Sequence, residues 1–209
     1  MAMWTRAGAY EGWGLLWSLM AAVVLWSAAT FLVWGGGAEG VRAAIRATAR
    51  ISLLLFLGAF LASSLHALMR RGATQWLCRN RRYLGLGFAW SHFVHLLFIL
   101  LFWRLDAPAF LEGRTPGSFV PGTIGYLFIA ALAATSFDGP ARRIGPKAWK
   151  LLHVTGVWFI FVQFAVSFGK RVEAKPAYVW FMVLLAAALA VRIGGWMAKR
   201  RRGAAVTTA

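Results

Sequence analysis

Residues 83–103 read YLGLGFAWSHFVHLLFILLFW, an apolar run without a lysine, an arginine or an acidic residue. Arg82 precedes the run and Arg104 follows it. About 20 helical residues are needed to cross the hydrocarbon core of a bilayer, because each residue adds about 1.5 Å along the helix axis. The run therefore predicts a transmembrane helix, and it carries two of the four histidines of the chain, His92 and His95.

Five further stretches of the same character fill most of the 209-residue chain. Hydrophobic residues make up 60% of the sequence and charged residues only 14%, a composition that a water-soluble fold of this size could not bury in one core. The apolar runs are continuous and do not alternate as the strands of a membrane barrel would. The sequence predicts an all-α integral membrane protein, a single domain over residues 1–209 with a short cytoplasmic tail at 199–209. Its six predicted helices lie near residues 13–35, 50–69, 83–103, 117–137, 149–169 and 176–198.

Basic residues are distributed unequally between the two sides of the predicted bundle. Fifteen of the 23 Lys and Arg residues lie on the side that also holds both termini, and Arg6 is the first of them. The other eight are Arg42, Arg46, Arg50, Arg104, Arg114, Lys170, Arg171 and Lys175. Cytoplasmic loops of membrane proteins are enriched in lysine and arginine. We therefore predict that both termini are cytoplasmic, in a multi-pass membrane protein.

The net charge of +17 does not indicate nucleic acid as a partner. The basic residues stand in clusters between apolar stretches, so anionic headgroups of the lipid bilayer are the simpler partner. Cys78 is the only cysteine, which excludes an intramolecular disulfide and a cysteine metal cluster. The tail from Lys199 to Ala209 is too short for a flavin and nicotinamide domain. We therefore predict no catalytic residues in this chain and a separate redox partner.

Three of the four histidines, His92, His95 and His153, lie inside predicted spans, where an ionisable side chain is costly and usually has a partner. His95 stands 13 residues beyond the arginine that precedes its span and is expected roughly 20 Å into the membrane. His153 is expected only roughly 5 Å in, and His66 at about the same depth. His92 neighbours His95 on one helix face, because it lies three residues earlier.

Each histidine also has an interpretation that needs no cofactor. His92 and His95 could form hydrogen bonds between helices, including bonds to Ser91 or Thr155, and the two shallow histidines could be solvated among headgroups. Zinc would need three or four clustered ligands, and no acidic residue lies well inside a span. Haem b needs only one or two axial histidines and an apolar slot, so haem is the metal group that this sequence favours.

Two motifs carry a resemblance to a known family. The run RRYLGLGFAW at residues 81–90, followed by His95, resembles the third helix of the ferric-reductase-like transmembrane family. The residues Ala134-Thr135-Ser136, then RRIG at 142–145, then Trp149 and His153 are similar to the end of the family's helix four, its cytoplasmic loop and the start of its helix five. In that family, histidines on helices three and five hold b-type haem, and electrons cross from a cytoplasmic donor to an outer acceptor.

The resemblance implies particular ligands. His95 falls on the outer-side histidine of helix three, and His153 on the inner-side histidine of helix five. The family pattern also has a histidine 13 residues after His153, where this chain has Val166. Substitute ligands would be His66 at the inner level and His92 at the outer level, with one or two haem groups bound.

The cytoplasmic basic residues have two interpretations. They could bind anionic lipid, or they could contact haem propionates or an acidic electron donor. The residues concerned are Arg81, Arg82, Arg142 and Arg143.

Two functions follow as hypotheses. The first is a membrane-embedded haem b electron-transfer subunit, which takes electrons from a flavin reductase or quinone and passes them to an outer-side acceptor protein. The alternative is a haem-less structural or assembly partner in a membrane complex, which Val166 favours.

Overall fold

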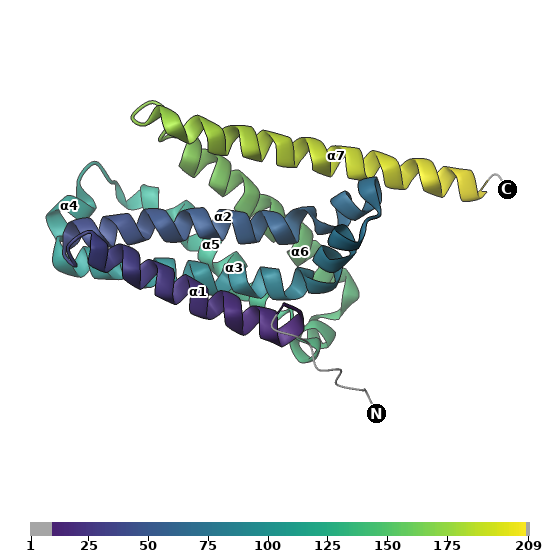
Figure 1. Ribbon diagram of the computed structural model, residues 1–209, viewed down its shortest axis with the longest axis horizontal. Coiled ribbons are helices and arrows are strands. Elements are labelled where there is room, and N and C mark those ends of the chain that lie inside the picture. Colours follow the sequence, from purple (N-terminus) through teal and green to yellow (C-terminus); the bar gives the residue numbers. More distant parts are fainter. Residues whose placement is uncertain (1–9, 208–209) are drawn as a thin grey trace.

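The computed structural model describes residues 10–207, with the side chains of residues 10–202, and the chain forms a bundle of long helices (Figure 1). Arg6, one of the basic residues used to predict the orientation, lies outside this range. The long helices are α1 (Gly12–Val33), α2 (Ala38–Met69), α3 (Gly72–Leu105), α5 (Val120–Ala134), α6 (Asp138–Gly169) and α7 (Val179–Thr207). Short helical turns join them at the end opposite the termini: α4 (Ala107–Leu111), η1 (Pro116–Phe119) and η2 (Pro176–Tyr178).

Six helical segments of the described chain are long and apolar enough to cross a membrane. Each contains most of one predicted span, and the described residues contain no strand. The prediction of an all-α bundle of six transmembrane helices is therefore confirmed.

Three helices begin well before the spans predicted from hydropathy. α2 begins at Ala38, α3 at Gly72 and α6 at Asp138, where the sequence predicted starts near residues 50, 83 and 149. The segment AEGVRAAIRATAR at 38–50 contains charges that end a hydropathic run, yet alanine and arginine are strong helix formers. The helices therefore extend beyond the apolar stretch. α7 likewise continues to Thr207, through most of the segment predicted as a tail.

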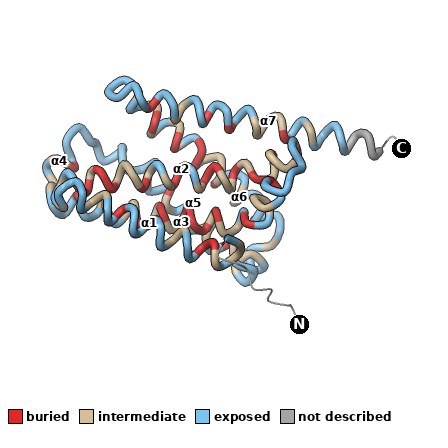
Figure 2. Tube along the Cα trace, in the orientation of Figure 1, coloured by how far each residue is buried: buried red, intermediate tan, exposed pale blue. Residues whose placement is uncertain are grey.

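α2 and α3 are antiparallel neighbours at the centre of the bundle. Only Arg70 and Arg71 join them, and Arg70 adopts a left-handed conformation with φ 44° that ends α2. α1 packs on both of these helices, α5 packs on α6, and α7 packs chiefly on α2. Figure 2 shows that buried residues concentrate on the central helices, whereas α7 is mostly exposed.

Aromatic side chains fill the space between α2, α3 and α6. The cluster includes Phe56 and Phe60 of α2, Phe88 of α3, and Phe161 and Phe164 of α6. Phe56 lies 5.4 Å from Phe60, 5.4 Å from Phe88 and 5.5 Å from Phe164 between ring centroids. Ring pairs at these separations add stability beyond the area that they bury. Phe56, Phe60 and Phe88 of this cluster also line the candidate site.

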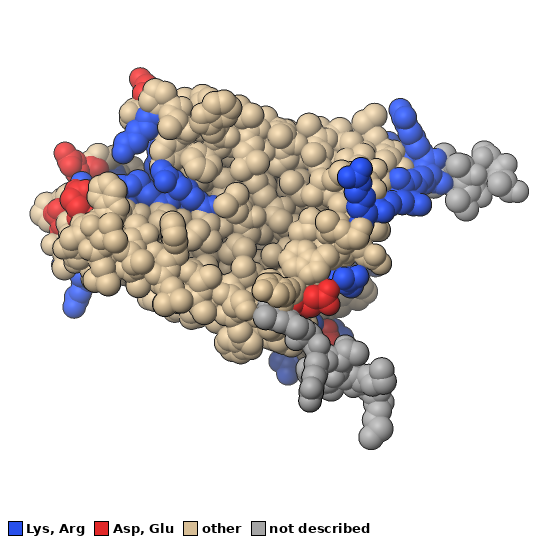
Figure 3. All heavy atoms as spheres, viewed as in Figure 1, with Lys and Arg blue, Asp and Glu red and all other residues tan. Residues whose placement is uncertain are grey.

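The first and last described residues lie at the same end of the bundle, as six crossings require (Figure 1). We call this end the termini end. On the face drawn in Figure 3, charged side chains gather toward the two ends of the molecule. Four of the six acidic residues, Glu39, Asp106, Glu112 and Glu173, belong to the opposite end. The termini end therefore has a large excess of positive charge.

This excess predicts that the termini end is cytoplasmic. A green fluorescent protein fused after Ala209 should fluoresce, because that reporter folds in the cytoplasm, and alkaline phosphatase at the same place should be inactive. Alkaline phosphatase inserted after Glu112, between α4 and η1, should be active as the matched control. Active phosphatase after Ala209 would contradict the orientation.

Candidate functional site

A cavity of about 450 Å³ opens between α2, α3, α5 and α6 near the termini end. Phe56, Phe60, Phe88 and Ile160 are among its apolar walls, and His153 is the histidine that lines it. The volume lies within the range of roughly 300–1,000 Å³ that is usual for ligand sites. Mostly apolar walls with a few convergent polar groups are typical of a cofactor or substrate site.

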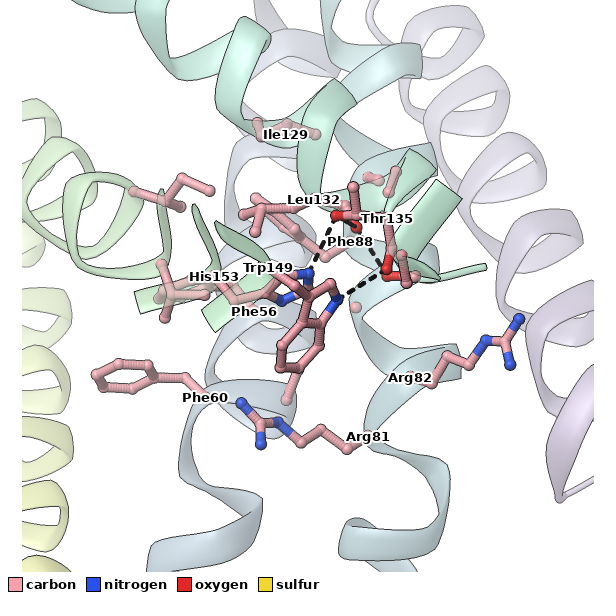
Figure 4. A pocket seen from close by; sticks show the side chains of 18 of the residues that line it. Phe56, Phe60, Arg81, Arg82, Phe88, Ile129, Leu132, Thr135, Trp149 and His153 are labelled. Carbon is pink, nitrogen blue, oxygen red and sulfur yellow. Dashed lines mark hydrogen bonds between the residues drawn. The ribbon is translucent and has the colours of Figure 1, made fainter. Parts of the chain in front are cut away.

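His153 is held in this cavity by two neighbours. Its Nε2 lies 3.1 Å from the hydroxyl oxygen of Thr135, and its ring stacks on Trp149 with centroids 4.1 Å apart. The Thr135 hydroxyl donates to the carbonyl of Ala131 at 2.6 Å, so its oxygen accepts from Nε2–H of His153. The indole of Trp149 donates to the Thr135 carbonyl at 3.0 Å. Figure 4 shows both side chains meeting at Thr135. The imidazole is therefore fixed in both position and tautomer.

A break in α6 brings these residues to the cavity. Gly145 has φ 76° and ψ 165°, values outside the helical range, and Pro146 begins the helix again. Glycine adopts this conformation without the steric cost that a Cβ would add, and proline is favoured at a first helical position. Before the break, Asp138 and Ala141 line the cavity. After it, Trp149 and His153 stand one turn apart on the face of α6 that meets Thr135.

The arginines predicted to contact a propionate or a donor divide into two groups. Arg81 and Arg82, together with Arg79, line the cavity. In Figure 4, Arg81 extends beneath Trp149 toward Phe60, whereas Arg82 points away, and its guanidinium lies 5.2 Å from the centre of the Phe137 ring. Arg142 and Arg143 are exposed on the first segment of α6 and do not line the cavity. The positive charge at the cavity thus comes from α3.

His66 does not line the cavity. It lies in the last turn of α2, and its Nδ1 is 3.2 Å from the hydroxyl oxygen of Thr74 at the start of α3. The structure therefore places the predicted substitute ligand beside the α2–α3 turn rather than next to His153.

His92 and His95 lie together on α3, with ring centroids 5.5 Å apart. Nδ1 of His95 is 2.9 Å from the hydroxyl oxygen of Thr48 on α2. That hydroxyl donates to the carbonyl of Ala44 at 2.8 Å, so Nδ1 of His95 is the donor and Nε2 carries no proton. Metal-ligating histidines commonly have this arrangement, in which a bond at one nitrogen orients the ring and leaves the other nitrogen available.

His92 faces the other side, toward α5 and α6. Its ring lies 5.7 Å from Tyr126 and meets Phe164 edge-on, also at 5.7 Å between centroids. Nδ1 of His92 and the hydroxyl of Tyr126 are buried, and neither has a hydrogen-bond partner in the described part of the chain. Two buried polar atoms without partners are unusual and point to a missing group or a functional role.

The hydrogen-bond partners suggested by the sequence were wrong. Ser91 accepts a bond from Ser52 of α2 at 2.8 Å, and Thr155 is exposed on α6. α2 is the helix that packs against this part of α3, so His95 bonds to Thr48. The sequence offered no signal for Thr48 or Tyr126, because a single hydroxyl in an apolar helix does not reveal which helix it faces.

Among the residues that the structure describes, no group of three or more His, Cys, Asp and Glu side chains could hold a metal ion. The fold and the site therefore define a six-helix membrane protein with a cavity that offers one histidine and several arginines, together with a buried histidine pair further along α3.

Comparison with known proteins identifies the class. Residues 43–164, which run from α2 through most of α6, match the ferric reductase like transmembrane component family. The chain belongs to this family, as the motifs at 81–95 and 134–153 predicted. The match contains all four histidines and ends before Val166 and α7.

A curated relative is the protein-methionine-sulfoxide reductase heme-binding subunit MsrQ of Ralstonia nicotianae. It is 31% identical over 143 residues, which are 66% of this chain and 65% of the relative. No solved structure matches the chain.

The bond between Thr135 and His153 can be tested directly. Thr135→Val should lower the free energy of unfolding by about 1 kcal/mol, the usual net value of a buried hydrogen bond. Thr123→Val is the matched control, since this exposed hydroxyl on the same helix donates only to the carbonyl of Phe119. Unfolding of both variants in the same detergent gives the comparison. Equal losses in the two variants would show that His153 gains nothing from Thr135.

Proposed function

We propose that this protein is a membrane-embedded haem-binding subunit that passes electrons across the bilayer. The observation that carries the proposal is the cavity beside His153, in a chain of the ferric-reductase-like family. The name of the Ralstonia relative, a heme-binding subunit, supports haem as the group bound.

The residues of the cavity fit a haem group by their chemistry. An apolar slot accommodates a porphyrin, a neutral imidazole provides an axial ligand, and arginines pair with propionates. Phe56, Phe60 and Phe88 supply the apolar walls, His153 the imidazole, and Arg81 a guanidinium. The bond from Nε2 of His153 to Thr135 must be given up if that nitrogen holds iron. Trp149 would continue to position the ring by stacking.

The proposed haem is of the b type. Covalent attachment of haem uses a C-x-x-C-H motif, and Cys78, the only cysteine, is followed by Arg79, Asn80 and Arg81. When bound, the group supplies a one-electron redox centre whose potential depends on its axial ligands and the nearby charge. The arginines of α3 would favour the reduced form, because they stabilise the additional negative charge.

The outer level has two candidate ligands. His95 occupies the position of the family's outer-side histidine on helix three, and its bond to Thr48 leaves Nε2 available. His92 is the alternative, since its Nδ1 is buried without a partner in the described chain. Rings of Phe88, Phe164 and Tyr126 surround His92, and the cavity does not reach this pair. We therefore propose one haem at His153 and treat a second, held by His95, as the further possibility that the variants below resolve.

The partners follow from the orientation. With the termini end in the cytoplasm of a bacterial cell, the cavity faces an electron donor there, either a flavin reductase or a quinone in the inner membrane. His95, further along α3, is nearer the outer side, where an acceptor protein would bind. The match covers 65% of the length of the relative, so this assignment of activity and partners is a proposal.

The alternative function, a haem-less structural or assembly partner, has one observation in its favour. Val166 stands where the family pattern has a second histidine on α6, and its side chain is 44% exposed at the surface of the bundle. An absorption spectrum of the purified protein before and after dithionite separates the two functions. A sharp b-type α band supports the haem subunit, and a silent spectrum supports the alternative.

Histidine variants test the ligands. His153→Ala should strongly reduce haem content, because iron at the termini end loses its axial donor. His95→Ala should do the same for a haem at the outer level, with a smaller effect for His92→Ala. His66→Ala is the matched control, because this histidine lies outside the cavity. Wild-type haem content in His153→Ala would refute the site, and a larger loss in His92→Ala than in His95→Ala would reverse the outer assignment.

Arginine variants test the charge at the cavity. Arg81→Gln and Arg82→Gln should slow haem reduction by a cytoplasmic donor and lower the reduction midpoint potential, since each removes a positive charge from the cavity wall. Arg142→Gln and Arg143→Gln remove the same charge from exposed positions and should leave the potential unchanged. The measurements are a potentiometric titration and stopped-flow reduction. The same shift in all four variants would mean that only the overall charge matters.

A further inference from the structure

A second pocket, of about 460 Å³, lies on the opposite side of α2 from α3, between α2, α6 and α7. It is lined by Ser63, Ser64, Trp158, Arg192, Ile193, Trp196 and Lys199. None of these residues lines the cavity at His153, and the three residues on α7 that carry the argument, Arg192, Trp196 and Lys199, lie beyond the segment that matches the family. This pocket is a separate site.

Arg192 is the unusual residue of this pocket. It stands ten residues before Arg202, so it lies roughly 15 Å deeper along α7 than the basic cluster at the end of the helix. It donates one bond to the backbone carbonyl of Phe60 at 2.8 Å, and its guanidinium lies over the Phe60 ring at 4.6 Å. A guanidinium has five N–H donors. In the described structure, no carboxylate pairs with Arg192, because the ion pairs there belong to Arg42 and Arg79.

The other polar groups of the pocket are also donors. Lys199 lies seven residues after Arg192, two helical turns further along the same face, with Trp196 between them. Ser63 and Ser64 contribute hydroxyls from α2. Two cations and two hydroxyls without an acidic residue form a site for an anion.

The packing of α7 keeps this pocket open. Gly195 of α7 meets Ser64 of α2 so closely that a Cβ on the glycine would lie 2.5 Å from the serine Cβ. Below this contact, Arg202 donates to the carbonyl of Ala67. α7 is thus fastened to α2, whereas it makes little contact with α6. The crevice that remains between α6 and α7 is flanked by the indole rings of Trp158 and Trp196, a residue type typical of the membrane interface.

We propose that this pocket binds the phosphate of an anionic phospholipid, with Arg192 and Lys199 on the phosphate oxygens and an acyl chain along the exposed Ile193. Basic pockets between transmembrane helices on the cytoplasmic side are suited to anionic headgroups. Among the described residues, the termini end has 14 basic residues and only Glu11 and Asp138 as acids, so its counter-charge must come from outside the protein. A lipid suits the site better than dissolved phosphate, because the pocket opens between helices at a depth that lipid reaches.

The test uses the full chain, purified in detergent and analysed by native mass spectrometry with added phosphatidylglycerol or phosphatidylcholine. The wild type should retain phosphatidylglycerol preferentially. Arg192→Gln should weaken its binding by about tenfold, the expected effect of losing a charge-assisted hydrogen bond. Arg201→Gln, on the same helix but exposed and outside the pocket, should change it by less than about twofold. Equal loss in the two variants would overturn the proposal, because binding would then depend on overall charge.

A second variant separates binding from folding, since Arg192 also holds α7 against α2. Ser63→Leu fills the pocket without changing charge, and it should reduce phosphatidylglycerol binding as much as Arg192→Gln does. Wild-type preference in Ser63→Leu would overturn the proposal. Millimolar inorganic phosphate should not displace the lipid; if it does, the site binds free phosphate and the lipid assignment is wrong. None of these outcomes depends on whether the protein binds haem.

Discussion

A polar group within the hydrocarbon is costly unless it finds a partner inside the protein, and this constraint organises the contact between α2 and α3. α2 and α3 satisfy it together. Ser52 donates to Ser91 at 2.8 Å, and His95 bonds to Thr48 at 2.9 Å, one turn away along α2. Each bond joins a side chain of α2 to a side chain of α3. A rotation of either helix about its axis would therefore leave a hydroxyl or an imidazole buried without a partner. The two bonds therefore fix which face α3 presents to α5 and α6, and His92 is on that face.

The same constraint explains how far the sequence predicts the structure. The six spans follow from composition alone, because uncharged runs such as residues 83–103 have no other stable location. The first residues of the helices could not be predicted from hydropathy. The charged segments at 38–50 and 72–82 are also helical, although they precede the apolar runs. Hydropathy measures where a helix can be in lipid, whereas helix propensity and the short turn at Arg70 and Arg71 decide where it begins.

The candidate site was predictable by residue but not by arrangement. The motifs contain His153, Trp149 and Thr135, although only His153 was predicted as a site residue, and the structure joins these three by a hydrogen bond, a stack and a second hydrogen bond. Which arginines meet the cavity was not predictable, because Arg81 and Arg143 lie on equally basic stretches. The segment of α6 before the break at Gly145 lines the cavity with Asp138 and Ala141, whereas its Arg142 and Arg143 are exposed. Thr48 could not be found either, since its importance depends on which face of α2 meets α3.

Three arginines of the described chain, Arg42, Arg81 and Arg192, differ in what balances their charge. Arg42, at the end opposite the termini, lies 3.4 Å from Glu39 and 4.0 Å from Asp106, so the protein neutralises it. Arg81 lines a cavity in which Asp138 is the one acidic lining residue among those described. Positive charge therefore remains for an anionic group such as a propionate. Arg192 has a backbone carbonyl and an aromatic face but no acid. Since an unbalanced cation is costly at that depth, an anion from the surrounding bilayer is the neutraliser that its position allows.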